Sequence, residues 1–204
     1  MLEFMYKDSY TRLCEHDLSI RLPNVSKLDL HVHAYAIGQK YQVIGLPEKA
    51  RELFMAEADR IVWQEDLDPD LGRKQMLETF NNDPETALTA GYQPGFRDRA
   101  LPRTGIYPPV NLHTPEADMI RFLHALQLLF LKVSDRQDGL RKRVLQLMMS
   151  RFEFLAELNP FKVLLDNDKE IQGALKEVFR EEGYDLEILG ARDVLKWRGR
   201  LAEH

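Results

Sequence analysis

The sequence predicts a mainly α-helical protein in which two helical parts are joined by a long proline-rich linker. Apolar residues recur every three or four positions along most of the chain, which is the spacing of one helix face. Several of these runs begin after a capping residue and end at glycine or proline. Seven of the ten prolines and four glycines lie between residues 64 and 118, a composition that interrupts helices.

Composition narrows the class of protein. The 204 residues are 44% hydrophobic and 30% charged, as in ordinary globular proteins, and the single cysteine excludes an intrachain disulfide and suits a reducing compartment. A net charge of −5 argues against general binding to nucleic acid or anionic membranes. Residues 1–20 lack the apolar core of a secretory signal, and the longest apolar run is too short to cross a bilayer. We therefore expect the cytosol or the nucleus and no membrane.

The first predicted part covers residues 1–62. A helix-like apolar run occupies residues 2–6, and it indicates either a helix that docks at once or a chain that lacks its true start. After a polar loop, Asn24 or Ser26 is the candidate cap of a helix that continues to about residue 41. A short apolar turn follows, and Pro47 suits the first position of a second helix ending near residue 62.

Residues 63–114 form the predicted linker. Short helices are expected at residues 72–80 and 84–90, and residues 92–114 are expected to be extended. The third part, residues 115–183, begins with Thr114 as cap and Pro115 in the first turn of a helix that is apolar on nearly every face. The further expected elements are an amphipathic helix at 136–158 ended by Pro160, an apolar segment at 161–165, a helix at 168–182 closed by Gly183, and a tail at 184–204 with a short strand or turn and a weak helix.

Histidines and the one cysteine give no strong site. On a helix, His31 and His33 lie on nearly opposite faces and cannot chelate one metal ion. Cys14 and His16 are neighbours in a predicted loop, where no geometry supports a nucleophile and its base. His124 lies in a nearly all-apolar helix and is expected to be a core histidine bonded to a carbonyl. We predict no catalytic residue, no metal and no cofactor.

Charged and aromatic side chains also give no strong candidate for a functional site. Arg136 precedes the basic cluster LRKR at residues 140–143, which we interpret as a solvated helix face, with a phosphate contact or a nuclear import signal as the alternative. Carboxylates stand in charge-mixed helices, where ion pairs are commoner than acid–base dyads. Trp63 and Trp197 are expected to pack rather than to anchor a partner.

Two stretches resemble a known family. Residues 30–54 read LHVHAYAIGQKYQVIGLPEKARELF and resemble the helical hairpin near the end of a BTB/POZ domain of the fungal type. Residues 1–10 resemble the preceding helix, with Met5 in place of a leucine, and residues 134–180 are similar to the C-terminal extension of such proteins. The matching hairpin positions are Tyr35, Ala36, Lys40, Tyr41, Leu46, Ala50 and Phe54.

The resemblance implies a non-enzymatic protein–protein interaction protein. It covers only the helical half of the domain, so residues 1–62 are expected to be a truncated BTB/POZ domain whose N-terminal strands are missing. Binding to a cullin scaffold would require that missing half. Exposed apolar faces should promote self-association or binding to protein partners. The alternatives are a small helical enzyme that uses His113 or His124 near the linker, and a nuclear regulator that contacts nucleic acid through residues 140–143.

Overall fold

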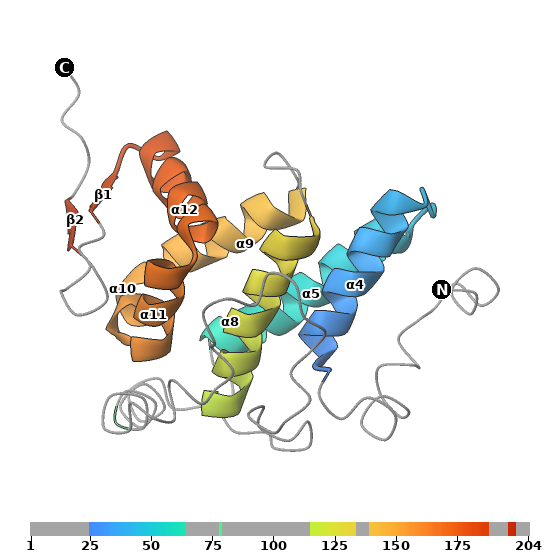
Figure 1. Cartoon of the computed structure of the whole chain (residues 1–204), viewed down its shortest axis with the longest axis horizontal. Coiled ribbons are helices and arrows are strands. Elements are labelled where there is room, and N and C mark those ends of the chain that lie inside the picture. The colour runs from blue at the N-terminus through green and yellow to red at the C-terminus, as the bar shows by residue number, and fades with distance from the viewer. Residues whose placement is uncertain (1–24, 64–77, 79–114, 134–138, 188–195, 199–204) are drawn as a thin grey trace. The chain divides into compact units, whose positions relative to one another are not determined.

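The computed structural model describes residues 25–63, 78, 115–133, 139–187 and 196–198. This part of the chain contains seven α-helices and one two-stranded antiparallel sheet, so the mainly helical prediction is confirmed (Figure 1). None of these helices is long and apolar enough to span a bilayer. The elements are α4 (Lys27–Lys40), α5 (Leu46–Trp63), α8 (Pro115–Lys132), α9 (Gly139–Ser150), α10 (Phe152–Glu157), α11 (Asn159–Asn167), α12 (Lys169–Glu181), β1 (Asp185–Glu187) and β2 (Lys196–Arg198).

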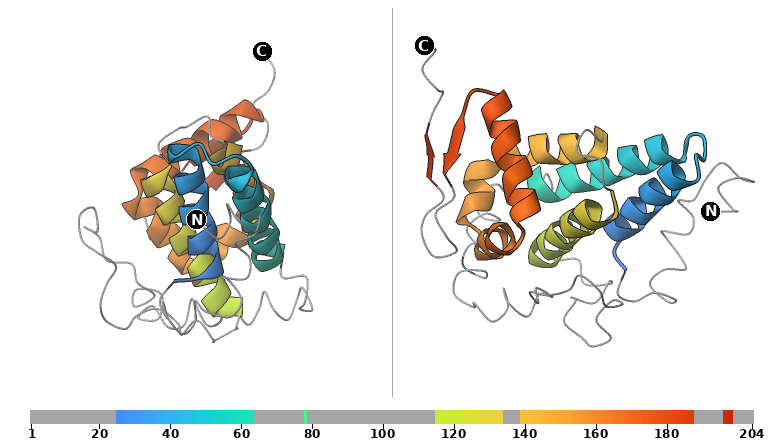
Figure 2. Two further views of the ribbon diagram at one scale, coloured as in Figure 1. Left: turned by 90° about the vertical axis from the view of Figure 1, so that its right-hand side faces the viewer. Right: turned by 45° about the horizontal axis from the view of Figure 1, so that its top comes forward.

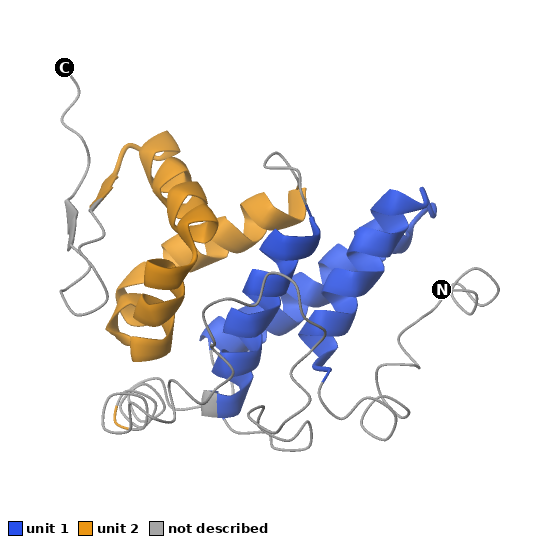
Figure 3. Cartoon of the chain, in the orientation of Figure 1, with its two compact units in different colours: residues 1–65, 104–133 blue, residues 66–103, 134–204 orange. Residues whose placement is uncertain are grey.

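The chain divides into two compact units (Figure 3). Unit 1 combines Met1–Glu65 with Thr104–Val133, and unit 2 combines Asp66–Arg103 with Ser134–His204. This division differs from the predicted domains, because α8 belongs with α4 and α5 rather than with the C-terminal helices. Except for the helical Glu78, the predicted linker at 63–114 lies outside the described residues once α5 has ended.

Unit 1 is a hairpin of α4 and α5 with α8 packed against it, and Figure 2 shows the hairpin from two further sides. Both helices of the hairpin were predicted with nearly these bounds. Ser26, rather than Asn24, caps α4: its hydroxyl accepts from the Asp29 N–H, and the Asp29 carboxylate accepts from the Ser26 N–H in return. The fully buried side chains of this core include Val32, Ala50, Phe54, Ala58, Phe122, Leu126 and Leu129.

Unit 2 corrects one helix prediction. The single helix expected at 136–158 is broken, because α9 ends at Ser150 and α10 begins at Phe152. The break lets Phe152 turn inward, where its ring packs edge-on against Phe161 and Phe179, with ring centroids 6.2 and 4.9 Å away. The end of α10 also differs, because Pro160 lies in the first turn of α11 and so begins a helix as well as ending one.

The two ends of α12 agree with the sequence. Asp168 caps α12 by accepting from the N–H groups of Glu170 and Ile171, each at 3.1 Å. Gly183 has a φ of 80°, which closes the helix as predicted, and the Tyr184 N–H donates to the Phe179 carbonyl at 2.8 Å. The expected short strand is β1, which pairs with β2 so that Leu186 stands opposite Trp197. The weak helix also expected in the tail is not found at residues 196–198, which form β2, and residues 188–195 and 199–204 lie outside the described part of the chain.

Candidate functional site

The turn between α4 and α5 is tight and is closed by backbone hydrogen bonds. The Tyr41 N–H donates to the Ile37 carbonyl at 3.0 Å, and the Val43 N–H donates to the Gly38 carbonyl at 2.9 Å. Gln42 and Gly45 both have positive φ, at 52° and 77°. The chain therefore reverses direction within a few residues.

This turn carries apolar side chains that face solvent. We name Ile37, Tyr41 and Ile44 the hairpin tip; they are 36%, 60% and 95% exposed. Ile37 and Tyr41 are one helical turn apart, so they share a face, and Ile44 follows in the loop. The Lys40 ammonium lies 5.4 Å from the centre of the Tyr41 ring, within cation–π range. The tip is therefore an apolar surface with one cation at its rim.

A second constellation joins α4 to α8. The His124 Nδ1–H donates to Asp29 Oδ1 at 3.0 Å, and Asp29 Oδ2 accepts from the Ser26 N–H at 3.0 Å. Asp29 is only 4% exposed, so one buried carboxylate both caps α4 and holds α8. The partner of His124 corrects the expectation of a carbonyl, because the acceptor is a charged carboxylate contributed by the other helix.

The two histidines of α4 are separated as predicted. His31 is buried at 6% exposure, and His33, two residues on, is half-buried. Burial lowers the pKa of His31 to about 4, although the nearby Glu57 carboxylate opposes the shift. Burial also lowers the pKa of His33. Both imidazoles are therefore neutral at pH 7. Among the described residues, no group of three metal-ligating side chains could hold a metal ion.

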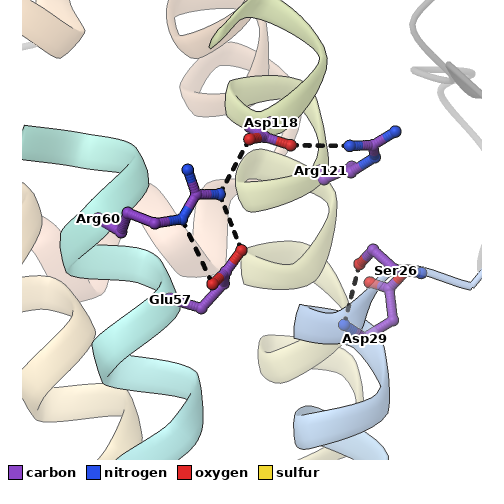
Figure 4. Close-up of polar contacts among 6 residues, drawn as sticks. All are labelled: Ser26, Asp29, Glu57, Arg60, Asp118 and Arg121. Atoms are coloured by element: carbon purple, nitrogen blue, oxygen red, sulfur yellow. Dashed lines mark hydrogen bonds and ion pairs between the residues drawn. The ribbon is translucent and has the colours of Figure 1, made fainter. Parts of the chain in front are cut away.

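A charge network links α5 to α8 (Figure 4). Arg60 Nη2 donates to Glu57 Oε1 and to Asp118 Oδ2, both at 2.9 Å, and Arg121 Nη1 donates to Asp118 Oδ1 at 2.7 Å. The hydrogen bonds from Arg60 to Glu57 and Asp118 raise the pKa of its guanidinium. Each carboxylate in the network thus faces an arginine, an arrangement suited to joining helices rather than to moving protons.

The basic cluster is not a uniformly solvated face, which corrects the sequence interpretation. The Arg141 side chain is only 2% exposed, and its Nη1 donates to Glu170 Oε1 at 3.0 Å. Lys142 and Arg143 are exposed, and Lys142 pairs with Glu181 at 3.1 Å. The cluster therefore presents fewer free cations than its sequence suggests, which weakens the case for a phosphate contact.

The other predicted candidates are spread over the chain. Trp63 is 45% exposed at the end of α5, so it is less packed than expected. Trp197 lies in β2. Cys14, His16 and His113 lie outside the described residues, as do Arg136, Met5 and residues 1–10.

Sequence reasoning missed the residues that join the helices. Asp29 had a usable signal, since Ser26 followed three residues later by an acid is a capping-box pattern. No sequence signal links Arg60 to Asp118, because 58 positions separate them. The hairpin tip was also missed, because apolar residues at helical spacing are normally taken to be buried. Comparison with family models, with curated proteins and with solved structures finds no match to this chain.

Proposed function

We propose that this chain is a non-enzymatic protein–protein interaction protein of the BTB/POZ type and that the hairpin tip is its contact surface. The observation that carries the proposal is the exposure of Ile37, Tyr41 and Ile44 on a hydrogen-bonded turn. An apolar side chain left in water forgoes about 25 cal/mol for each Å² that a partner would cover. A fixed apolar surface of this kind favours binding rather than catalysis.

The BTB/POZ assignment draws support from the hairpin. Four of the family-like positions, Tyr35, Leu46, Ala50 and Phe54, are buried core residues of α4 and α5. Two others, Lys40 and Tyr41, stand at the end of α4 and touch through a cation–π contact. The helix, short apolar turn and helix that the resemblance implies therefore match the observed sequence of elements.

The proposed occupant of the tip is a short apolar segment of a partner protein that carries a carboxylate. Three side chains are a small surface beside the roughly 800 Å² per partner that a stable dimer buries, so a short segment fits better than a second copy. The Lys40 ammonium at the rim favours an acidic residue next to the apolar contact.

A dye that is both apolar and anionic tests this chemistry. We expect anilinonaphthalene sulfonate to fluoresce with the full chain and to lose most of this emission with Ile44→Asp, because the new charge repels the sulfonate and opposes burial of the ring. Lys40→Gln should reduce the dye fluorescence by less than Ile44→Asp does. The matched control is Gln146→Asp on α9, which adds the same charge at an exposed polar position and should leave the emission unchanged.

Sedimentation of the same variants separates binding from self-association. A chain that sediments as a monomer and binds dye through Ile44 supports the proposed occupant, whereas dimers that dissociate in Ile44→Asp would assign the tip to a second copy. A cooperative, monomeric chain that binds no dye, or dye emission indifferent to Ile44→Asp, would contradict the proposal.

One observation favours the alternative function, a small helical enzyme. A histidine whose Nδ1–H donates to a buried carboxylate resembles the base of many hydrolytic sites, and His124 and Asp29 have this arrangement. The capping role of Asp29 explains the same contact without catalysis. An enzyme would lose its turnover with His124→Gln while the dye response of the tip stayed intact, so the two functions are separable by one variant.

A further inference from the structure

Among the residues that the structure describes, exposed large apolar side chains occur only in unit 1. They are Ile37, Tyr41, Ile44, Trp63 and Leu131. Trp63 and Leu131 lie in the last turns of α5 and α8, one in each helix. The other three form the hairpin tip, where the Lys40 ammonium adds a positive charge. The tip is therefore the largest group of exposed apolar side chains in the described part of the chain.

One stretch of the sequence has the composition of the occupant proposed for the tip. Residues 2–6 read LEFMY and combine four large apolar side chains with the carboxylate of Glu3. They lie outside the described residues, and no function proposed so far uses them. An apolar surface with a cation at its rim favours such a segment, because burial of apolar area and attraction between opposite charges act together.

The length of the chain between this segment and the tip allows a contact within one molecule. Residues 7–25 connect the segment to Ser26, the cap of α4. The 14 residues of α4 place the tip about 21 Å from that cap, at 1.5 Å per residue. The 19 connecting residues can span at most roughly 60 Å. Both the segment and the tip also belong to unit 1, so the contact needs no placement of one unit against the other.

A covalent connection lowers the affinity that such a contact requires. It holds the segment near the tip at an effective concentration on the order of 1 mM. A contact with a dissociation constant of about 1 mM is then formed in about half of the molecules. A ligand that competes for the tip binds about 2-fold more weakly as a result, and a tighter contact increases this factor in proportion.

We propose that residues 2–6 bind the hairpin tip of their own chain and compete with the partner protein for it. In this contact Glu3 pairs with Lys40, and the apolar side chains of the segment cover Tyr41 and Ile44. The inference rests on the proposed function of the tip and adds its regulation. A partner gains the whole surface only by displacing the segment, so binding is weaker than the exposed tip alone would allow.

Dye binding to the full chain tests the competition. Phe4→Ser/Met5→Ser removes competing apolar side chains and should raise the affinity for anilinonaphthalene sulfonate at least 2-fold. Glu3→Gln should raise it by less. The matched control, Leu18→Ser/Ile20→Ser, removes two apolar side chains from the connecting residues and should leave the affinity unchanged. In an Ile44→Asp background, Phe4→Ser/Met5→Ser should bring no gain.

A spin label locates the segment without the dye. The label is attached through Lys7→Cys after the single native cysteine has been removed by Cys14→Ser. We expect the label to broaden the amide resonances of residues 37–45 and to lose this effect when Phe4→Ser/Met5→Ser is added. Broadening seen only between chains, in a mixture of spin-labelled and isotope-labelled molecules, would overturn a contact within one chain.

Failure of this inference differs from failure of the proposed function. Dye emission indifferent to Ile44→Asp would contradict the tip as a binding surface. Dye that binds through Ile44 with equal affinity in the wild-type chain and in Phe4→Ser/Met5→Ser would keep the binding surface and overturn its coverage by residues 2–6. An absence of broadening at residues 37–45 would overturn that coverage as well.

Discussion

Gly38 and Pro47 are in direct contact across the hairpin: a Cβ added to Gly38 would lie 2.8 Å from the Pro47 ring carbons. Ordinary Cβ contacts are much longer, so a side chain at residue 38 would force α4 and α5 apart. The contact fixes the backbone on which the hairpin tip is mounted, and it connects the fold of unit 1 to the proposed binding surface.

Gly38→Ala should lower the free energy of unfolding by about 1–3 kcal/mol, because the added methyl overpacks the hairpin. The matched change is Gly173→Ala on α12, where nothing lies within 4 Å. There alanine should raise stability by up to about 1 kcal/mol through helix propensity. Urea unfolding of both variants measures the difference, and equal effects of the same sign would show that the contact with Pro47 is unimportant.

The ion pair of Arg141 should matter more than that of Lys142. Glu170→Ala leaves the buried guanidinium with less compensation, so we expect a loss of about 1–2 kcal/mol in the free energy of unfolding. Glu181→Ala removes the exposed partner of Lys142 and should cost less than about 0.5 kcal/mol. If the two variants unfold at the same urea concentration, the burial of Arg141 has no energetic consequence.

Removal of the capping hydroxyl and removal of the shared carboxylate should have different costs. Ser26→Ala deletes one cap bond and should cost about 1 kcal/mol. Asp29→Asn should cost more, because it weakens the return bond to Ser26 and the contact with His124 together. In a double-mutant cycle, Asp29→Asn and His124→Gln should be clearly non-additive. Additive costs would mean that the α4–α8 hydrogen bond contributes little.

The unfolding free energy should decrease in mild acid. The pKa of His31 is lower in the folded chain than in the unfolded chain, so the unfolded state binds the extra proton. The stability that neutral His31 supports is complete above pH 6.5 and is lost as the pH falls toward 4. Between pH 6.5 and 5 this amounts to about 2 kcal/mol. Urea unfolding across this range, compared with His31→Gln, isolates the contribution of this ring.

Local rules predicted most of the helices. Ser26, Asp168 and Gly183 act at helix ends through bonds to residues a few positions away, so their roles can be read from short sequence windows. The opposite placement of His31 and His33 followed from helix geometry alone. The mainly helical class and the α4–α5 hairpin could therefore be predicted from the sequence.

Contacts between residues far apart in the chain could not be predicted from the sequence. The buried position of Arg141 depends on Glu170 in another helix, and the break at residue 151 depends on aromatic rings contributed by α11 and α12. The carboxylate partner of His124 lies 95 positions away. Periodicity shows that a face will be buried but not which element will cover it, so the polar site in unit 1 could not be foreseen.

The discontinuous make-up of unit 1 sets the order in which it can fold during synthesis. Asp29 leaves the ribosome 95 residues before its partner His124. At roughly 5–20 residues per second, that interval lasts roughly 5–20 s. Throughout it, the faces of α4 and α5 that α8 will cover remain open to water and to other chains. The nascent hairpin is thus the form of this protein most exposed to aggregation and to chaperones, well before the complete chain is released.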